Sequence, residues 1–101
     1  MENDIYTLGY WRVKPGKQAE FVAAWKSLGD YFVSFPQPPG KGTLVQSVED
    51  DSLFYSFGRW PSLDAVQAMR ADSRTPAEIG KLAALCEEAS PGSFREVAQS
   101  G

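Results

Sequence analysis

Two stretches of the chain, residues 5–13 and 53–60, carry bulky apolar side chains at both odd and even positions. Successive side chains of a β-strand point to opposite faces, so such strands are apolar on both sides. The first stretch places on one face Ile5, Trp11 and Val13, and on the other Tyr6, Leu8 and Tyr10. The second places on one face Phe54 and Trp60, and on the other Leu53, Tyr55 and Phe57. We therefore expect two strands that need a cover on each face.

The segment between them predicts a helix and a third strand. Apolar residues recur at helical spacing from Phe21 to Phe32, and the helix is expected to end at residues 34–42, which hold three prolines and two glycines. A short strand is expected at residues 44–48. The polar turn at residues 49–52 then joins it to the 53–60 strand as a hairpin.

The second half of the chain predicts two helices and a last strand. Ser62 is placed to cap a helix that has on one face Leu63, Val66 and Met69. The run Thr75-Pro76-Ala77-Glu78 has the form of a capping box with proline at the first helical position. It predicts a third helix, with the inward residues Ile79, Leu82, Leu85 and Cys86. We expect Pro91-Gly92 to end this helix and residues 93–98 to form the last strand.

This order of elements, β-α-β-β-α-α-β, predicts one α+β domain spanning residues 1–101. With the last two helices taken as one broken crossover, it is the ferredoxin-like split βαβ topology, a four-stranded antiparallel sheet with helices on one face. That topology places the two doubly apolar strands at the centre of the sheet. A chain of this length buries only roughly 65% of its unfolded surface. We therefore expect the uncovered face to meet a second copy in a two-fold homodimer. The pattern leaves open which aromatic residues face the helices and which face the partner.

Composition narrows the possible functions. The net charge is −3 and the ten Lys and Arg residues are scattered, so we expect no nucleic-acid partner. No apolar run is long enough to span a bilayer and no leader pattern begins the chain, so we expect no membrane association and a cytoplasmic location. The single cysteine, Cys86, cannot form an internal disulfide and is expected to be a buried structural thiol.

The sequence contains no histidine. This excludes Ser-His-Asp and Cys-His nucleophile pairs, histidine-ligated zinc or iron, and a proximal histidine on haem. We therefore expect no metal site and no cofactor. A general base would be Asp, Glu, Lys, Tyr or the substrate itself.

Two motifs carry a resemblance to a known family. The run Tyr10-Trp11-Arg12-Val13-Lys14-Pro15-Gly16-Lys17, and the strand end Phe57-Gly58-Arg59-Trp60-Pro61-Ser62, resemble the antibiotic biosynthesis monooxygenase superfamily. The resemblance spans nearly the whole chain in element order. It implies a dimeric α/β barrel in which each subunit has an aromatic-lined pocket for a small aromatic ligand.

The resemblance also implies a chemistry. Some members of this superfamily oxygenate polyphenolic or anthrone-like substrates without metal or flavin, and others oxidise quinols, degrade haem or have no known activity. In the oxygenating members a tryptophan near the end of the third strand helps to form the pocket, often with an asparagine four residues before it. Trp60 matches the tryptophan, but Ser56 stands at the asparagine position. The expected function is a cofactor-independent monooxygenase acting on a small aromatic, polyphenolic or quinol substrate. The alternative is a non-catalytic ligand-binding or stability module on the same fold.

The candidate site residues each have a functional and a structural interpretation. Trp60 and Trp11 form a wall for a flat ligand, or they are core or dimer contacts. Arg59 holds a phenolate and lowers the pKa of a bound phenol, or it is a solvated charge at a strand end. Thr7 and Ser56 orient a polar ligand atom, or they only allow close packing.

Phe54 is a further candidate for substrate binding. Arg70 and Arg74 are read as surface charges.

Overall fold

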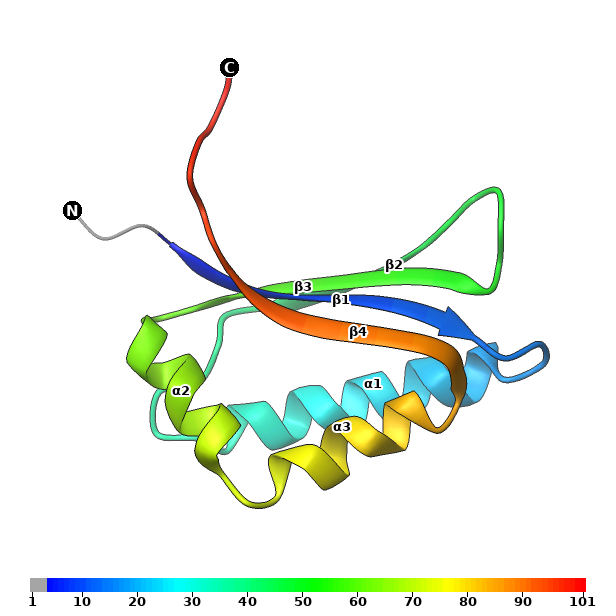
Figure 1. The fold of residues 1–101 in the computed structure, drawn as a ribbon, viewed down its shortest axis with the longest axis horizontal. Coiled ribbons are helices and arrows are strands. Elements are labelled where there is room, and N and C mark those ends of the chain that lie inside the picture. Colours follow the sequence, from blue (N-terminus) through cyan, green and yellow to red (C-terminus); the bar gives the residue numbers. More distant parts are fainter. Residues whose placement is uncertain (1–3) are drawn as a thin grey trace.

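The computed structural model describes residues 4–101 and has the predicted α+β architecture (Figure 1). Its elements are β1 (Ile5–Val13), α1 (Gln18–Val33), β2 (Gly42–Gln46), β3 (Leu53–Trp60), α2 (Leu63–Ala71), α3 (Thr75–Ala83) and β4 (Cys86–Arg95). The sheet order is β2-β3-β1-β4 and all neighbours are antiparallel. The ferredoxin-like fold and the central positions of β1 and β3 are therefore confirmed.

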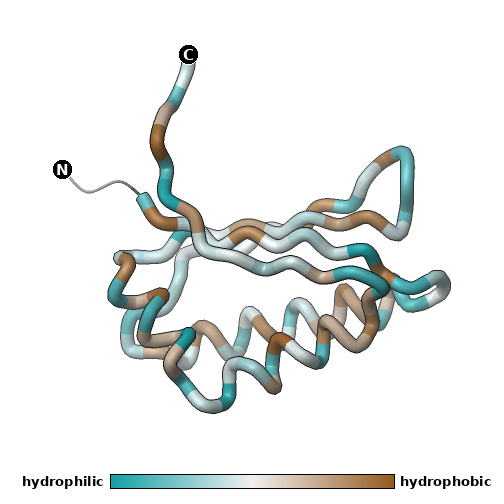
Figure 2. Tube along the Cα trace, viewed as in Figure 1, coloured by the Kyte–Doolittle hydropathy of each residue, from teal (hydrophilic) through white to brown (hydrophobic). Residues whose placement is uncertain are grey.

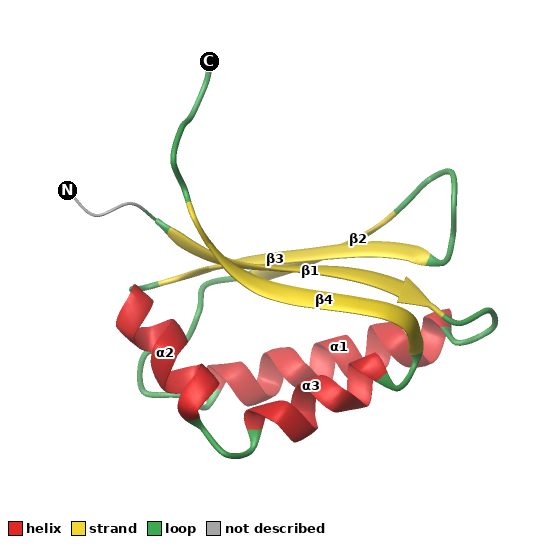
Figure 3. Ribbon diagram, in the orientation of Figure 1, coloured by secondary structure: helices red, strands yellow, loops and turns green. Residues whose placement is uncertain are grey.

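All three helices lie on one side of the sheet (Figure 3). The alternation along β1 and β3 follows from this arrangement, because the side chains that face the helices are buried, except the half-buried Thr7, and the others are half-buried or exposed. Figure 2 shows hydrophobic positions along the central strands and helices, and hydrophilic ones at the tip of the β2–β3 loop. The sheet therefore has one helix-covered face and one open face.

The helix-covered face carries two separate hydrophobic clusters. The first lies under α1 and α3 and consists of Trp11, Val13, Phe21, Leu28, Phe54, Leu82 and Cys86. The second lies under α2, at the other end of the sheet, and consists of Ile5, Trp60, Ala65, Val66 and Met69. The side chains between these clusters are small, which matters for the site described below.

The prediction for the last strand was wrong. Helix α3 ends at Ala83, and β4 begins at Cys86 and runs through Pro91 and Gly92 to Arg95. Proline is tolerated here because β4 is at the edge of the sheet. The N–H of Glu96 bonds to the carbonyl of Asp4. By antiparallel alternation, the nitrogen of Pro91 then points away from β1, where no ladder bond is lost.

The predicted capping box does not form, and β2 is displaced from its predicted range. Thr75 is the first residue of α3, and its hydroxyl bonds to the carbonyl of Met69 instead of capping the helix. Strand β2 ends at Gln46 because the Ser47 hydroxyl accepts bonds from the next turn, at 3.1 Å from the N–H groups of Glu49 and Asp50. The hairpin with β3 is confirmed, as is the Ser62 cap, whose hydroxyl accepts from Ala65 N–H at 3.1 Å.

None of the helices in residues 4–101 is long and apolar enough to cross a bilayer.

Candidate functional site

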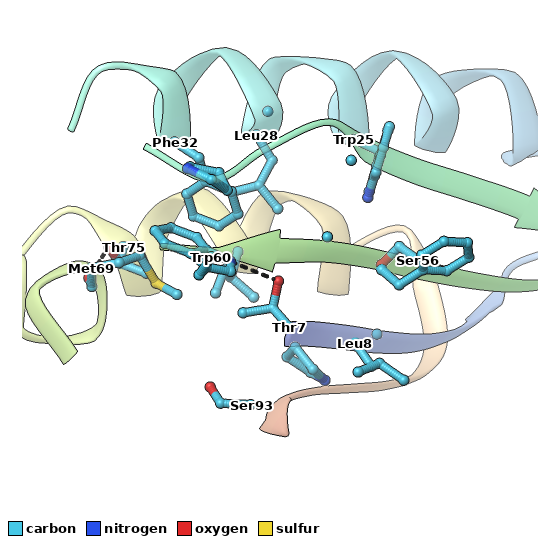
Figure 4. Close-up of a pocket in the computed structure, with 18 of the residues that line it drawn as sticks. Thr7, Leu8, Trp25, Leu28, Phe32, Ser56, Trp60, Met69, Thr75 and Ser93 are labelled. Carbon is cyan, nitrogen blue, oxygen red and sulfur yellow. Dashed lines mark hydrogen bonds between the residues drawn. The ribbon is translucent and has the colours of Figure 1, made fainter. Parts of the chain in front are cut away.

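A cavity of about 780 Å³ lies between the helix-covered face of the sheet and helices α1, α2 and α3 (Figure 4). This volume is within the range of small-molecule sites. Its aromatic walls are Trp11, Trp25, Phe32 and Trp60. Residues 39–42, which lead into β2, line one side of it. Four of the predicted site residues line the cavity.

The cavity exists because two rows of the sheet carry small side chains. Across β3 and β1, Gly58 pairs with Thr7, and Ser56 pairs with Gly9. On one side of these rows lies the bulky pair Phe54 and Trp11, and on the other side lies the pair Trp60 and Ile5. Side chains at these bulky positions hold the helices away from the sheet, and the small side chains of the two rows between them leave space for the cavity. The small residues at alternate positions of β1 and β3 therefore form the floor of the cavity.

The indole of Trp11 lies against Gly9 and Ser56 on the cavity floor, and a hydrogen bond fixes it there. Its indole Nε1–H donates to Ser56 Oγ at 3.0 Å, and both side chains are buried. A Cβ atom on Gly9 would overlap the indole nitrogen of Trp11, so glycine is required at this position. Phe21 supports the ring from behind, with centroids 5.6 Å apart. The orientation of Trp11 thus depends on a hydroxyl and on the missing side chain of Gly9.

Trp60 is fixed in the same way at the other end of the cavity. Its Nε1–H donates to Thr7 Oγ1 at 3.0 Å, the bond drawn in Figure 4. The ring of Phe32 from α1 meets Trp60 edge-on, with centroids 5.3 Å apart. Trp60 is only 3% exposed, so its indole is part of the hydrophobic cluster under α2 as well as a wall of the cavity.

A third polar group joins the helices above the cavity. The Thr75 hydroxyl is 2.6 Å from the Met69 carbonyl, to which it donates, and 2.7 Å from the Tyr31 hydroxyl. Since the only proton on Thr75 Oγ1 is used toward Met69, Tyr31 donates to Thr75. The only donor of Thr75 is thereby used, and the residue ties α1, α2 and α3 together at a buried point.

Charged side chains line the mouth of the cavity. They are three cations, Lys26, Lys41 and Arg70, and one carboxylate, Asp30. The Nε–H of Arg70 donates to Ser93 Oγ on β4 at 3.0 Å. An excess of positive charge at the mouth favours an anionic ligand. Arg70 was read as a surface charge from the sequence, and its place at the cavity depends on the register of β4, which the sequence did not reveal.

The structure brings together Trp60, Trp11, Thr7 and Ser56 at the cavity, but not Arg59 or Phe54. Arg59 alternates with Trp60 and points to the opposite face, where Nη2 forms an ion pair with Asp4 Oδ1 at 2.8 Å. Phe54 is 3% exposed and packs in the cluster under α1. The arginine that lines the cavity is therefore Arg70 and not Arg59, which the sequence interpretation had proposed.

Cys86 lies outside the cavity, in the cluster under α1 and α3. Burial raises the pKa of its thiol above the ordinary value. Among residues 4–101, no group of three or more His, Cys, Asp and Glu side chains converges as metal ligands do.

Several solved structures share this fold. A variant of SnoaB, a cofactor-independent oxygenase from Streptomyces nogalater, superposes with a TM-score of 0.83 at 20% sequence identity, covering 97% of this chain and 96% of that chain. A candidate antibiotic biosynthesis monooxygenase from Bordetella bronchiseptica gives 0.78 at 16% identity, with 96% and 100% covered. A conserved protein from Methanosarcina mazei Go1 gives 0.78 at 16% identity, with 95% of each chain covered. No protein-family model matches the sequence, and no curated protein matches it either. The ferredoxin-like α+β fold of the single chain, which the resemblance to antibiotic biosynthesis monooxygenases implied, is confirmed.

Proposed function

We propose that this protein is a cofactor-independent monooxygenase acting on a small aromatic, polyphenolic or quinol substrate. The observation that carries the proposal is the cavity of about 780 Å³ walled by three tryptophans and Phe32. Flat aromatic walls suit a flat aromatic ligand, which gains contact area by stacking or edge-on packing. The shared fold with a cofactor-independent oxygenase supports the same reaction class.

The reaction is written for an anthrone as an example of this class. The substrate loses a proton from its acidic ring carbon to give a phenolate-like anion, and the anion transfers one electron to dioxygen. Recombination of the two radicals forms a carbon–oxygen bond, and loss of water leaves the quinone. One substrate and one O₂ thus give one quinone and one water, with the substrate supplying all the electrons.

The residues of the cavity supply what this reaction needs from a protein. The tryptophans exclude water, which strengthens electrostatic interactions inside the cavity. Arg70 offers its remaining guanidinium N–H groups to the anion, which favours deprotonation of the bound substrate. Asp30 is the one carboxylate among the described lining residues, and it or a water molecule next to it is the proposed base.

Oxygen uptake tests the proposal and shows which of the two arginines, Arg59 or Arg70, the reaction needs. With anthrone or a hydroquinone as substrate, uptake should exceed autoxidation and persist with a metal chelator. Trp60→Ala and Arg70→Ala should each lower the rate about tenfold or more, on the order of 1.4 kcal/mol of barrier. Arg59→Ala is the matched control and should retain the rate, whereas the sequence-based hypothesis of a catalytic Arg59 predicts a comparable loss. Background rates over a broad substrate panel would overturn the monooxygenase proposal.

The alternative, a ligand-binding module without catalysis, is favoured by one observation. Asp30 is exposed at the cavity mouth, and none of the other described lining residues offers a carboxylate base. Binding of aromatic ligands in the cavity without oxygen uptake would establish this second function.

We also propose that two copies pair through the open face of the sheet. This face exposes a group of large apolar side chains: Leu8, Val45, Tyr55, Phe57 and Phe94, each between 40% and 54% exposed. An apolar surface of this kind is typical of an interface. Light scattering at micromolar concentration should give twice the mass of the 101-residue chain. Phe57→Asp should reduce that mass to one chain, and a monomeric parent protein would overturn the proposal.

A further inference from the structure

We propose that Ser56, Thr7 and Ser93 form a row of hydroxyl donors that selects ligands with acceptor oxygens on opposite sides of a ring. The inference rests on the proposed function only in taking the cavity as the ligand site. In this inference Trp11 and Trp60 also position two of the hydroxyls, because their indole N–H groups donate to these hydroxyls and not to the ligand.

Each hydroxyl of the row already accepts a hydrogen bond from a nitrogen. Ser56 Oγ accepts from Trp11 Nε1, Thr7 Oγ1 from Trp60 Nε1 and Ser93 Oγ from Arg70 Nε, all three at 3.0 Å. Indole and guanidinium N–H groups are donors only. The hydroxyl oxygen is therefore the acceptor in each pair, and its own proton has to point elsewhere.

None of the three hydroxyl protons has an acceptor among residues 4–101. All three residues line the cavity. Thr75 provides the contrast, because its hydroxyl lines the same cavity but already donates to the Met69 carbonyl. A hydroxyl that accepts a hydrogen bond is also polarised toward donating one. The cavity therefore offers three hydroxyls with a free proton and one whose proton is already used.

The sheet register sets the spacing of the row. Thr7 on β1 lies directly opposite Ser93 on β4, and it is a diagonal neighbour of Ser56 on β3. Side chains directly opposite are about 5 Å apart, and diagonal neighbours are about 7 Å apart. Figure 4 shows the three residues along the floor of the cavity. This spacing suits acceptor oxygens across a ring and not oxygens on adjacent carbons, as in the para-related carbonyls of a quinone.

Three ligands of similar shape test this inference by quenching of tryptophan fluorescence. They are 9,10-anthraquinone, its isomer 9,10-phenanthrenequinone with adjacent carbonyls, and anthracene without oxygens. We expect anthraquinone to bind about tenfold more tightly than anthracene, with phenanthrenequinone between them. Equal affinity for anthraquinone and anthracene, or binding of neither, would overturn the inference.

Variants of the row sharpen the test. Thr7→Val and Ser93→Ala should each reduce the preference for anthraquinone over anthracene about threefold or more, and Thr7→Ser should retain it. The matched controls are Thr43→Val and Ser90→Ala, which alternation places on the open face, and they should leave the preference unchanged. A preference that survives both cavity variants would also overturn the inference.

Two further features keep the test interpretable. Thr7→Val leaves the N–H of Trp60 without its acceptor and so reduces stability, whereas Ser93 is half-buried and accepts from the exposed Arg70, so its loss should leave the fold intact. Binding is measured without turnover. An absence of oxygen uptake would therefore refute the monooxygenase and leave the order of affinities standing, while equal affinities would refute the row and leave oxygen uptake standing.

Discussion

The two faces of the sheet are made from the same strands and differ in what they do with their apolar residues. On the helix-covered face, bulky residues stand at the two ends and small ones lie between them, which leaves a cavity. On the open face, large apolar residues continue along β1 and β3 and remain partly exposed. One face thus borders a cavity, and the other presents partly exposed apolar side chains.

The difference teaches that alternation alone does not distinguish a face that borders a cavity from a face that stays open. Both faces read as apolar in the sequence, and aromatic residues occur on each. The small residues are informative, because Thr7, Gly9, Ser56 and Gly58 all fall on one face. Small side chains at every second position of two paired strands therefore indicate the face that forms the floor of a cavity.

The largest expected effect comes from two phenylalanines on the same strand. Phe54 is 3% exposed on the helix-covered face and Phe57 is 44% exposed on the open face. Phe54→Ala should lower the free energy of unfolding by about 3–5 kcal/mol, since it leaves a cavity in the core. Phe57→Ala should have a smaller effect that grows with protein concentration, because it acts through the proposed dimer. Urea denaturation at two protein concentrations checks both, and equal losses would contradict the assignment of faces.

A smaller effect is expected from two glycines, again on opposite faces. Gly9→Ala forces the new methyl group against the indole of Trp11 and the hydroxyl of Ser56, and overpacking of this kind destabilises by about 1–3 kcal/mol. At Gly92 the added Cβ meets the ring of Phe94, which is 54% exposed and free to turn in the single chain. Gly92→Ala should therefore change the stability of the free chain by less than about 0.5 kcal/mol. Thermal unfolding of the two variants gives the comparison, and a tolerated Gly9→Ala would refute the packing described for Trp11.

The smallest effect concerns the thiol of Cys86 under α1 and α3. Burial raises its pKa, so the folded state disfavours the reactive thiolate. The contribution to stability is present below the ordinary pKa of a thiol and is lost as the pH rises through the higher pKa of the folded state. A thiol reagent at pH 8 should therefore label Cys86 far more slowly in the native protein than in urea. Equal rates would place Cys86 at the surface.

The sequence predicted the fold because its strongest signals are local. The doubly apolar strands can be recognised from the two-residue period of their side chains. The hairpin can be recognised from the polar turn at residues 49–52. The end of α3 was missed because residues 86–90 show no alternation of their own and take their strand conformation from pairing with β1. Pro91 was read as a stop signal, although an edge strand accommodates it.

The site was predicted in part for the same reason. Trp11, Trp60, Thr7 and Ser56 lie on strands whose alternation is readable, so their common face follows from the sequence. Arg70 and Ser93 meet only through the register of β4 and the position of α2, neither of which has a local signal. Arg59 was considered together with Trp60 because they are adjacent in the chain, but adjacent residues of a strand face opposite ways.

The proline at the outer edge of β4 has a consequence for how chains aggregate. An exposed edge strand is a template on which another chain can add a strand, the first step toward fibrils. Pro91 interrupts the row of outward N–H groups in the middle of β4, so a foreign strand cannot hydrogen-bond along its full length. The same residue that was expected to end a helix thus protects this side of the sheet against cross-β growth.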